Sequence, residues 1–188
     1  LSVRASRIRP GTDDKVLTSW NGLMLATMAE AVRVLESGSL PPNSDQKAGR
    51  FHKMATRNAE FLLRELRPDG KLKHSWRKSK TTNEVFLEDY AALILGLLEL
   101  YQTDFGNKWF VSAKGLADEM IELFEDPNGG FFDTAKEGEQ LLLRPKDAQD
   151  NATPSGNALA CEALLKLAEF TGEGKYRDLA EKALRLVV

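Results

Sequence analysis

The feature of this 188-residue chain that most limits its fold is a repeated pair of amphipathic helices. Apolar residues recur at helical spacing in six segments, which indicates six helices. These segments are residues 18–36, 45–66, 84–102, 108–125, 154–170 and 174–188. Taken two at a time, they predict three helical hairpins within a single domain over residues 1–188, at about 18–66, 84–125 and 154–188.

The second helix of each pair opens with one motif, a large aromatic residue followed four positions later by alanine. Side chains four positions apart lie on one helix face, so a ring beside a small residue lets a neighbouring helix approach closely. The motifs are Phe51/Ala55, Trp109/Ala113 and Tyr176/Ala180. The repeat is about 60–70 residues long, which exceeds the length of tetratricopeptide and HEAT repeats.

Long links with turn signals separate the pairs. Both RPDGKLKHSW and DPNGGFFDTAKEGEQLLLR open with a proline followed by Asp-Gly or Asn-Gly, which ends a helix and turns the chain. Short apolar stretches predict β-hairpins in these links, at Leu72–Trp76 and at Gly130–Phe132 with Leu141–Leu143. The prediction is an all-α fold, an α/α toroid with first helices in an inner ring and second helices in an outer ring.

Three hairpins would form half of a six-hairpin ring, and an open half-ring exposes apolar edges. We therefore expect the chain to associate with itself or with neighbouring segments that close the ring. The chain begins without Met and ends on EKALRLVV, a helical pattern with no cap. These ends predict a fragment of a longer protein.

Composition argues against several classes of function. A net charge of −2 and a pI near 5.8 provide no basic field for nucleic acid or an anionic membrane. No apolar run is long enough to span a membrane. The single cysteine, Cys161, excludes an internal disulfide, and His52 and His74 lack the spacing of a zinc site. We expect no metal, cofactor, nucleic acid or membrane, and a cytoplasmic location is favoured.

Four stretches of the chain resemble successive motifs of one known family. They are DDKVLTSWNGLM (13–24), LEDYAALILGLLELY (87–101), GGFFDT (129–134) and RPKDAQDNATPSGNALA (144–160). In order and content they are similar to the YyaL-like, spermatogenesis-associated family of thioredoxin-domain proteins. The resemblance implies a thioredoxin-like domain followed by a helical region similar to six-hairpin glycosidases and sugar 2-epimerases. It implies that this chain is the first half of that region, and it implies no particular reaction.

Acidic residues gather just before or at the start of the first helix of each pair, where a toroid would bring the links together. Asp89 and Asp150 are the acid/base candidates, since glycoside hydrolysis requires two carboxyl groups. Other residues could bind a sugar, because aromatic faces stack on sugar rings and polar groups bind hydroxyls. This set is Trp20, Asn21, Glu88, Tyr90, Arg144, Asp147 and Asn157.

Most of these positions also allow a purely structural interpretation. Thr18 or Ser19 could cap the first helix, and an acid such as Asp89 is favourable near a helix N-terminus. Thr153 fits the N-cap of the fifth helix, with Pro154 at its first position. Gly22, in the first helix, would permit a close helix contact.

The two histidines give little support for sugar epimerisation. That reaction needs a positioned base, often a histidine. Neither His52 nor His74 lies at the start of a first helix. His74 falls in a predicted hairpin, where we interpret it as exposed or merely hydrogen-bonded.

Two functions of different classes remain open. One is a carbohydrate-active domain that binds or processes a sugar or other small ligand, which is an analogy from fold to function. The other is a non-catalytic binding or scaffold domain that serves the thioredoxin-like domain of the same full-length chain. Whether the protein is an enzyme stays open. The fragment alone is expected to be inactive, because the rest of the ring would close the site.

Overall fold

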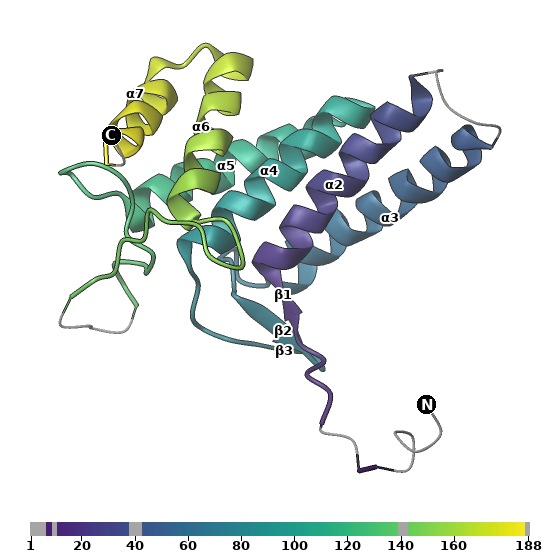
Figure 1. Ribbon diagram of the computed structural model, residues 1–188, viewed down its shortest axis with the longest axis horizontal. Helices are drawn as coiled ribbons and strands as arrows, with labels where there is room; N and C mark the ends of the chain where they lie inside the picture. Colours follow the sequence, from purple (N-terminus) through teal and green to yellow (C-terminus); the bar gives the residue numbers. More distant parts are fainter. Residues whose placement is uncertain (1–6, 9–10, 38–42, 139–142, 187–188) are drawn as a thin grey trace.

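The computed structural model describes residues 7–8, 11–37, 43–138 and 143–186. Within these ranges the chain forms six helices and one small sheet (Figure 1). The helices are α2 (Thr18–Glu36), α3 (Ser44–Glu65), α4 (Leu87–Asp104), α5 (Asn107–Phe124), α6 (Gly156–Thr171) and α7 (Gly174–Leu184). They follow the predicted ranges closely. None of the described helices combines the length and apolar character needed to cross a bilayer.

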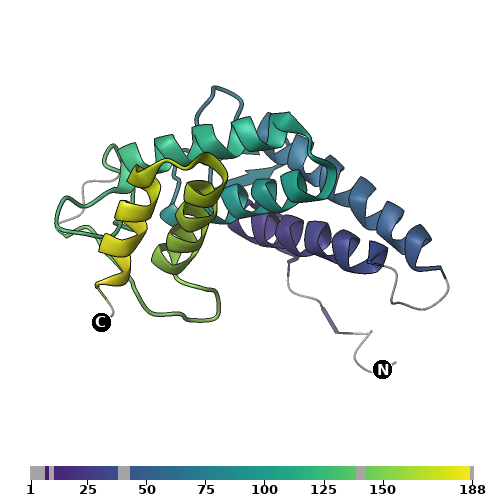
Figure 2. The ribbon, with the colours of Figure 1, turned by 90° about the horizontal axis from the view of Figure 1, so that it is seen from above.

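The helices form two layers, as an α/α toroid requires. In the first layer, α4 packs between α2 and α6. Each second helix packs against the first helix of its own pair, so α3 lies on α2, α5 on α4 and α7 on α6. Figure 2 shows α3 and α5 on the same side of α2 and α4. The predicted division into first and second helices is confirmed.

Glycine allows α2 and α4 to touch through their backbones. A Cβ atom on Gly22 would lie 2.6 Å from the carbonyl carbon of Ala92, and one on Gly96 would lie 2.7 Å from the carbonyl oxygen of Gly22. Neither helix could therefore carry a side chain at this crossing without moving apart. The predicted close contact at Gly22 is confirmed.

The aromatic/alanine motif anchors the second helices in the core. Trp109 and Tyr176 are fully buried, as are their alanine partners. Phe51 is half-buried, although Ala55 beneath it is fully enclosed. The motif therefore has the packing role that its spacing predicted.

The first link forms the predicted hairpin, and a third strand joins it from outside the link. β2 (Ser75–Arg77) pairs with β3 (Lys80–Thr81), while β1 (Val16–Leu17) pairs antiparallel with β2, with Val16 opposite Trp76. Strand β1 leads directly into α2. The small sheet thus ties the start of α2 to the link that precedes α4.

The second link differs from the predicted hairpin. Phe131 forms an isolated bridge with Glu125, at the end of α5, and Thr134 forms another with Phe86. Of the predicted partner stretch, residues 141–142 lie outside the described residues.

The predicted N-cap of the fifth helix, Thr153, is wrong. Helix α6 begins at Gly156, and Ser155 occupies the N-cap position, where its hydroxyl accepts a hydrogen bond from the Ala158 N–H at 3.1 Å. Gly156 lets the first turn of α6 approach Leu87 closely, because a Cβ atom there would lie 3.1 Å from the Leu87 side chain. The cap therefore lies where α6 and α4 meet.

Candidate functional site

The first turns of α2, α4 and α6 meet at one end of the molecule, together with the links that lead into them (Figure 1). Asp89, in the first turn of α4, binds the first turn of α2, because its carboxylate accepts the Ser19 N–H at 3.1 Å. A helix N-terminus presents unpaired N–H groups and partial positive charge, which together favour a carboxylate. The predicted cap of α2 by its own Thr18 or Ser19 side chain is therefore wrong, and the cap comes from α4.

Asp89 also binds the start of its own helix and a histidine from the link. Its second carboxylate oxygen accepts the Phe86 N–H at 3.0 Å. His74 Nδ1 lies 2.9 Å from this same oxygen. The Asp89 side chain is 0% exposed, whereas that of His74 is 24% exposed. A buried carboxylate thus holds an imidazole that reaches the surface.

Both members of this pair have raised pKa values. Burial raises the pKa of Asp89, although its hydrogen bonds oppose that shift. The hydrogen bond with Asp89 raises the pKa of His74, and burial opposes it. In the neutral imidazole with its proton on Nδ1, that nitrogen donates to Asp89 and Nε2 is an acceptor, whereas in the imidazolium both nitrogens donate. No described residue hydrogen-bonds Nε2, so this nitrogen is available to a ligand.

His74 stands in the wall of a cavity of about 380 Å³, which we call the His74 pocket. The link before α4, the first turn of α4, the link after α5 and the start of α6 enclose it. Its lining is His74, Phe86, Leu87, Glu88, Asp133, Asp147, Gln149, Asn151, Thr153, Pro154, Ser155 and Gly156. One histidine and three carboxyl groups therefore share one cavity with the N-terminus of α6.

Two of these carboxyl groups are half-buried, and both have raised pKa values. Burial, followed by the charge of Asp89, raises the pKa of Glu88, and the Ser19 hydroxyl donates to Glu88 at 3.5 Å. Burial also raises the pKa of Asp133, which accepts the Asp147 N–H at 2.9 Å. A carboxyl group with a raised pKa retains its proton to higher pH, so it can donate as well as accept.

Within the part of the chain that the structure describes, one group of side chains has the spacing of metal ligands. Ligand atoms of His74, Glu88 and Asp89 lie within 4.8 Å of one another. However, both Asp89 oxygens already accept backbone N–H groups, and the His74 contact has hydrogen-bond length. The donor set therefore suits a shared proton better than a metal ion.

The structure brings two of the predicted binding residues, Glu88 and Asp147, into the His74 pocket. Asp89 lies immediately behind its wall, enclosed by hydrogen bonds. Asp150 is exposed and binds its own loop, because its carboxylate accepts the Ser155 N–H at 2.9 Å. The acid/base roles of Asp89 and Asp150 stay predictions.

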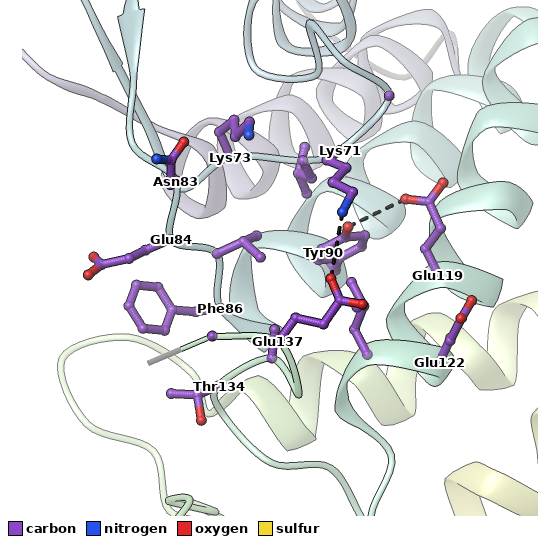
Figure 3. A pocket seen from close by; sticks show the side chains of 16 residues that line it. Lys71, Lys73, Asn83, Glu84, Phe86, Tyr90, Glu119, Glu122, Thr134 and Glu137 are labelled. Atoms are coloured by element: carbon purple, nitrogen blue, oxygen red, sulfur yellow. Dashed lines mark hydrogen bonds and ion pairs between the residues drawn. The ribbon is translucent and has the colours of Figure 1, made fainter. Parts of the chain in front are cut away.

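Tyr90 faces a different cavity. Its buried hydroxyl donates to Glu119 of α5 at 3.4 Å, in the wall of a pocket of about 600 Å³ (Figure 3). We call this the Tyr90 pocket. Consecutive residues of the LEDY motif therefore serve different purposes, since Glu88 lines the His74 pocket, Asp89 is enclosed and Tyr90 lines the Tyr90 pocket.

The remaining predicted residues have structural contacts in the described part of the chain. Asn157 is buried and exchanges hydrogen bonds of 2.9 Å with the backbone N–H and carbonyl of Phe131. Arg144 donates to the Thr134 carbonyl and lies 4.1 Å from the Phe132 ring centroid. Their roles in binding a sugar stay predictions.

The two predicted binding residues of α2 differ in exposure. Asn21 donates to the Leu17 carbonyl at 2.8 Å, whereas Trp20 is 60% exposed. Of the two, Trp20 is therefore the more accessible to a ligand. The sugar-binding roles of Trp20 and Asn21 also stay predictions.

His74 is the site residue that sequence reasoning missed. Its place in a link hairpin suggested an exposed or merely hydrogen-bonded residue, but its backbone N–H and carbonyl bind other segments. The His74 carbonyl accepts the Thr18 N–H at 2.9 Å, and the His74 N–H donates to the Glu84 carbonyl at 2.9 Å. The available signal was topology, because a link before a first helix ends where the first helices begin.

Comparison with known proteins agrees with the resemblance seen in the motifs. No protein-family model matches the chain. It is similar to spermatogenesis-associated protein 20 of Mus musculus, with 35% identity, and of Homo sapiens, with 34% identity. These matches cover 93% of the chain and 22% of each relative. The chain thus spans about a fifth of the length of these curated relatives, and the resemblance is confirmed.

Solved structures with the same architecture are carbohydrate-active proteins. Cellobiose 2-epimerase from Spirochaeta thermophila has a TM-score of 0.65 at 16% identity, over 92% of this chain and 43% of that one. An alpha-1,6-mannanase of Salegentibacter has a TM-score of 0.66 at 17% identity, over 100% of this chain and 50% of that one. These likenesses show the fold, an α/α toroid of the six-hairpin glycosidase type.

Proposed function

We propose that the His74 pocket binds a saccharide, and that His74 transfers a proton to or from it while Asp89 holds the imidazole. One observation carries this proposal. A fully buried aspartate fixes the histidine at the wall of a cavity, 2.9 Å away through Nδ1. An orienting carboxylate behind a histidine is a recurring arrangement for general acid–base catalysis, because it sets the tautomer and leaves Nε2 to act.

The lining of the pocket suits a polyhydroxylated ligand. Glu88, Asp133 and Asp147 offer carboxyl oxygens that accept hydrogen bonds from hydroxyl groups. Because its pKa is raised, Glu88 retains its proton to higher pH than an ordinary glutamate, and its protonated form can donate to a carbonyl or hydroxyl oxygen. A base, His74, and an acid, Glu88, would then share one cavity.

The structural neighbours support the choice of ligand class. One is a cellobiose 2-epimerase. An inactive variant of the alpha-1,6-mannanase carries asparagine in place of two consecutive aspartates. This chain has two consecutive acids, Glu88 and Asp89, at the start of α4. The likeness is one of fold and local composition, and it motivates a saccharide ahead of other ligands.

The arrangement favours proton abstraction from carbon over glycoside hydrolysis. Hydrolysis by the predicted pair requires that both Asp89 and Asp150 reach the substrate, and Asp150 does not line the His74 pocket. Asp89 is enclosed, and its two oxygens bind N–H groups of Ser19 and Phe86. His74 Nε2 would remove the proton next to the carbonyl of an open-chain reducing sugar, and Glu88 would protonate the carbonyl oxygen. If the enediol turned over in the pocket, His74 Nε2–H would return the proton to the opposite face and Glu88 would take back the hydroxyl proton, which would restore the carbonyl and invert the carbon.

Solvent exchange tests this proposal. The protein is incubated with reducing mono- and disaccharides in deuterated water, and deuterium uptake next to the sugar carbonyl is followed by proton NMR. Both the full-length protein and the 188-residue chain are used, because the chain spans about a fifth of its relatives. We expect exchange with at least one sugar. His74→Gln should slow it by about 100-fold or more, the usual contribution of general acid–base catalysis.

The matched control is His52→Gln, which changes the chain's other histidine, a residue of α3 that contacts the far end of α4, and should leave exchange intact. Release of new reducing ends without exchange would assign hydrolysis and contradict the proposed chemistry. If no saccharide exchanges, is cleaved or raises the melting temperature, the carbohydrate proposal fails. A non-catalytic scaffold for a thioredoxin-like domain would then be the better account. That partner, and self-association of the chain, stay predictions.

A further inference from the structure

The Tyr90 pocket is larger than the His74 pocket and lies beside it. Its volume is about 600 Å³, within the range of small-molecule sites. The link after α3, the segment before α4, helix α5 and the link after α5 form its walls (Figure 3). Phe86 lines both pockets and separates them. Most of the apolar wall comes from Leu72, Val85, Phe86 and Leu123.

The charged groups of this pocket are predominantly acidic. Four glutamates and two lysines line it. Lys71 pairs with Glu137 at 3.6 Å, and Figure 3 shows the two side chains meeting across the cavity. Lys73 pairs with Asp69, which lies outside the lining, at 3.5 Å. Among the described residues, Glu84 and Glu122 form no ion pair, so the wall carries surplus negative charge.

The acids concentrate on one side of α5. Glu119 and Glu122 are three residues apart and therefore lie on the same helix face. Glu119 is ion-paired with Arg67, and burial raises its pKa against the opposing charge of that guanidinium. Tyr90 donates to Glu119 and has a pKa raised to about 12, so it stays a neutral donor. Among the described residues Glu122 has no ion-pair partner, so a ligand cation could pair with it.

We propose that the Tyr90 pocket binds a small organic cation, an amine with an apolar body. The ammonium group would lie beside Glu122, and the apolar body would lie against Phe86 and Leu123. Aromatic faces also attract ammonium groups, so Phe86 suits either part of such a ligand. This site is separate from the saccharide site, because a sugar carries neither the charge nor the apolar surface that this cavity matches.

Three probes with the same ring and different charges test the proposal: phenethylamine, phenethyl alcohol and hydrocinnamate. Binding to the protein is measured by titration calorimetry and by saturation-transfer NMR. The amine should bind about fivefold more tightly than the alcohol, the size expected of an ion pair with the exposed Glu122. Hydrocinnamate should bind more weakly than the alcohol. Equal affinity of the amine and the alcohol, or no binding of the amine, would overturn the assignment.

Variants locate the binding. Glu122→Gln should weaken amine binding about fivefold and leave alcohol binding unchanged. The matched control, Glu169→Gln, alters an exposed glutamate of α6 outside the pocket and should change neither. Ala135→Phe should abolish binding of all three probes, because it fills the cavity without removing a charge. Cooperative thermal melts check that each variant is folded.

His74→Gln separates this site from the proposed function. It should abolish sugar exchange while leaving amine affinity unchanged. Equal effects of Glu122→Gln and Glu169→Gln, or unchanged amine binding in Ala135→Phe, would place the amine elsewhere and refute the proposal.

Discussion

Helix α4 contacts a histidine through an aspartate at each of its ends. At its beginning, Asp89 lies 2.9 Å from His74, and at its end Asp104 lies 3.2 Å from His52. The side chains differ sharply in exposure, at 0% for Asp89 and 25% for Asp104. Both contacts join an aspartate to a histidine, so the difference in burial comes from the segments that surround each pair.

The two carboxylates bind different numbers of segments. Asp104 accepts the Gly106 N–H at 2.8 Å and the Trp109 indole N–H at 3.1 Å, so it mainly secures the turn between α4 and α5. Asp89 instead joins α2, α4 and the link that carries His74. The buried junction at Asp89 raises the pKa of His74 and positions it at a cavity. Asp104 instead stabilises a local turn.

The largest expected effect is loss of the buried junction. Asp89→Ala would leave two backbone N–H groups and His74 without their partner, and should lower the free energy of unfolding by about 3–5 kcal/mol. Asp104→Ala removes a partly exposed cap and should cost about 1–2 kcal/mol. Urea denaturation of the two variants measures both values. Equal losses would contradict the distinction between the two ends.

Backbone packing near the start of α4 gives the next effect. Gly22→Ala would place a methyl group 2.6 Å from the Ala92 backbone and should destabilise the protein by about 1–3 kcal/mol. Gly115→Ala on α5 meets nothing within 4 Å and should stabilise it by about 0.5–1 kcal/mol through helix propensity. Thermal melts of the pair check the signs. A neutral Gly22→Ala would show that α2 and α4 are not in backbone contact.

A smaller effect is the pH dependence of stability. The pKa of His74 is raised on folding, so the folded state binds the proton more tightly than the unfolded state. Its contribution to stability is fully present below the ordinary pKa of 6.5 and is lost as the pH rises through the folded value. We expect the difference in stability between wild type and His74→Gln to shrink as the pH rises above 6.5.

Burial also raises the pKa values of Glu88, Asp89 and Asp133, and both proteins contain all three acids. The difference therefore reports His74 together with its effect on Glu88 and Asp89, whose pKa values it lowers. Urea denaturation at a series of pH values provides the curve. A difference that grows with pH would reverse the assigned direction of the His74 shift.

The smallest effect is expected at the far end of α4. His52→Gln changes an exposed side chain and should alter the free energy of unfolding by no more than about 0.5 kcal/mol. Urea denaturation of His52→Gln and His74→Gln under the same conditions compares their free energies of unfolding. A larger loss for His52→Gln than for His74→Gln would mean that the exposed contact is the stronger one.

The fold was largely predictable because its evidence is local. Helical spacing identified the six helices, Gly22 indicated a close crossing, and Trp109/Ala113 indicated a buried face. Each of these inferences depends on residues within one helix. The toroid then followed from the long links, which separate this repeat from shorter helical repeats.

The candidate site was less predictable because its contacts are not local. His74 and Asp89 are 15 residues apart, and Ser19 is 70 residues from Asp89. Asp89 alone had a satisfactory local explanation as an acid near a helix N-terminus, and His74 alone resembled an exposed loop residue. The pairing becomes visible when the fold brings the link against the helix start.

The most direct test of the account is the titration of His74 itself. In a His52→Gln background, the chain has one imidazole, so its ring proton can be followed by NMR without ambiguity. The account predicts a His74 pKa above its ordinary value of 6.5, and a lower value in Asp89→Asn and in Glu88→Gln, because both acids raise it. A His74 that titrates at or below 6.5 in the folded protein, unchanged by either substitution, would contradict the central role of the His74–Asp89 pair.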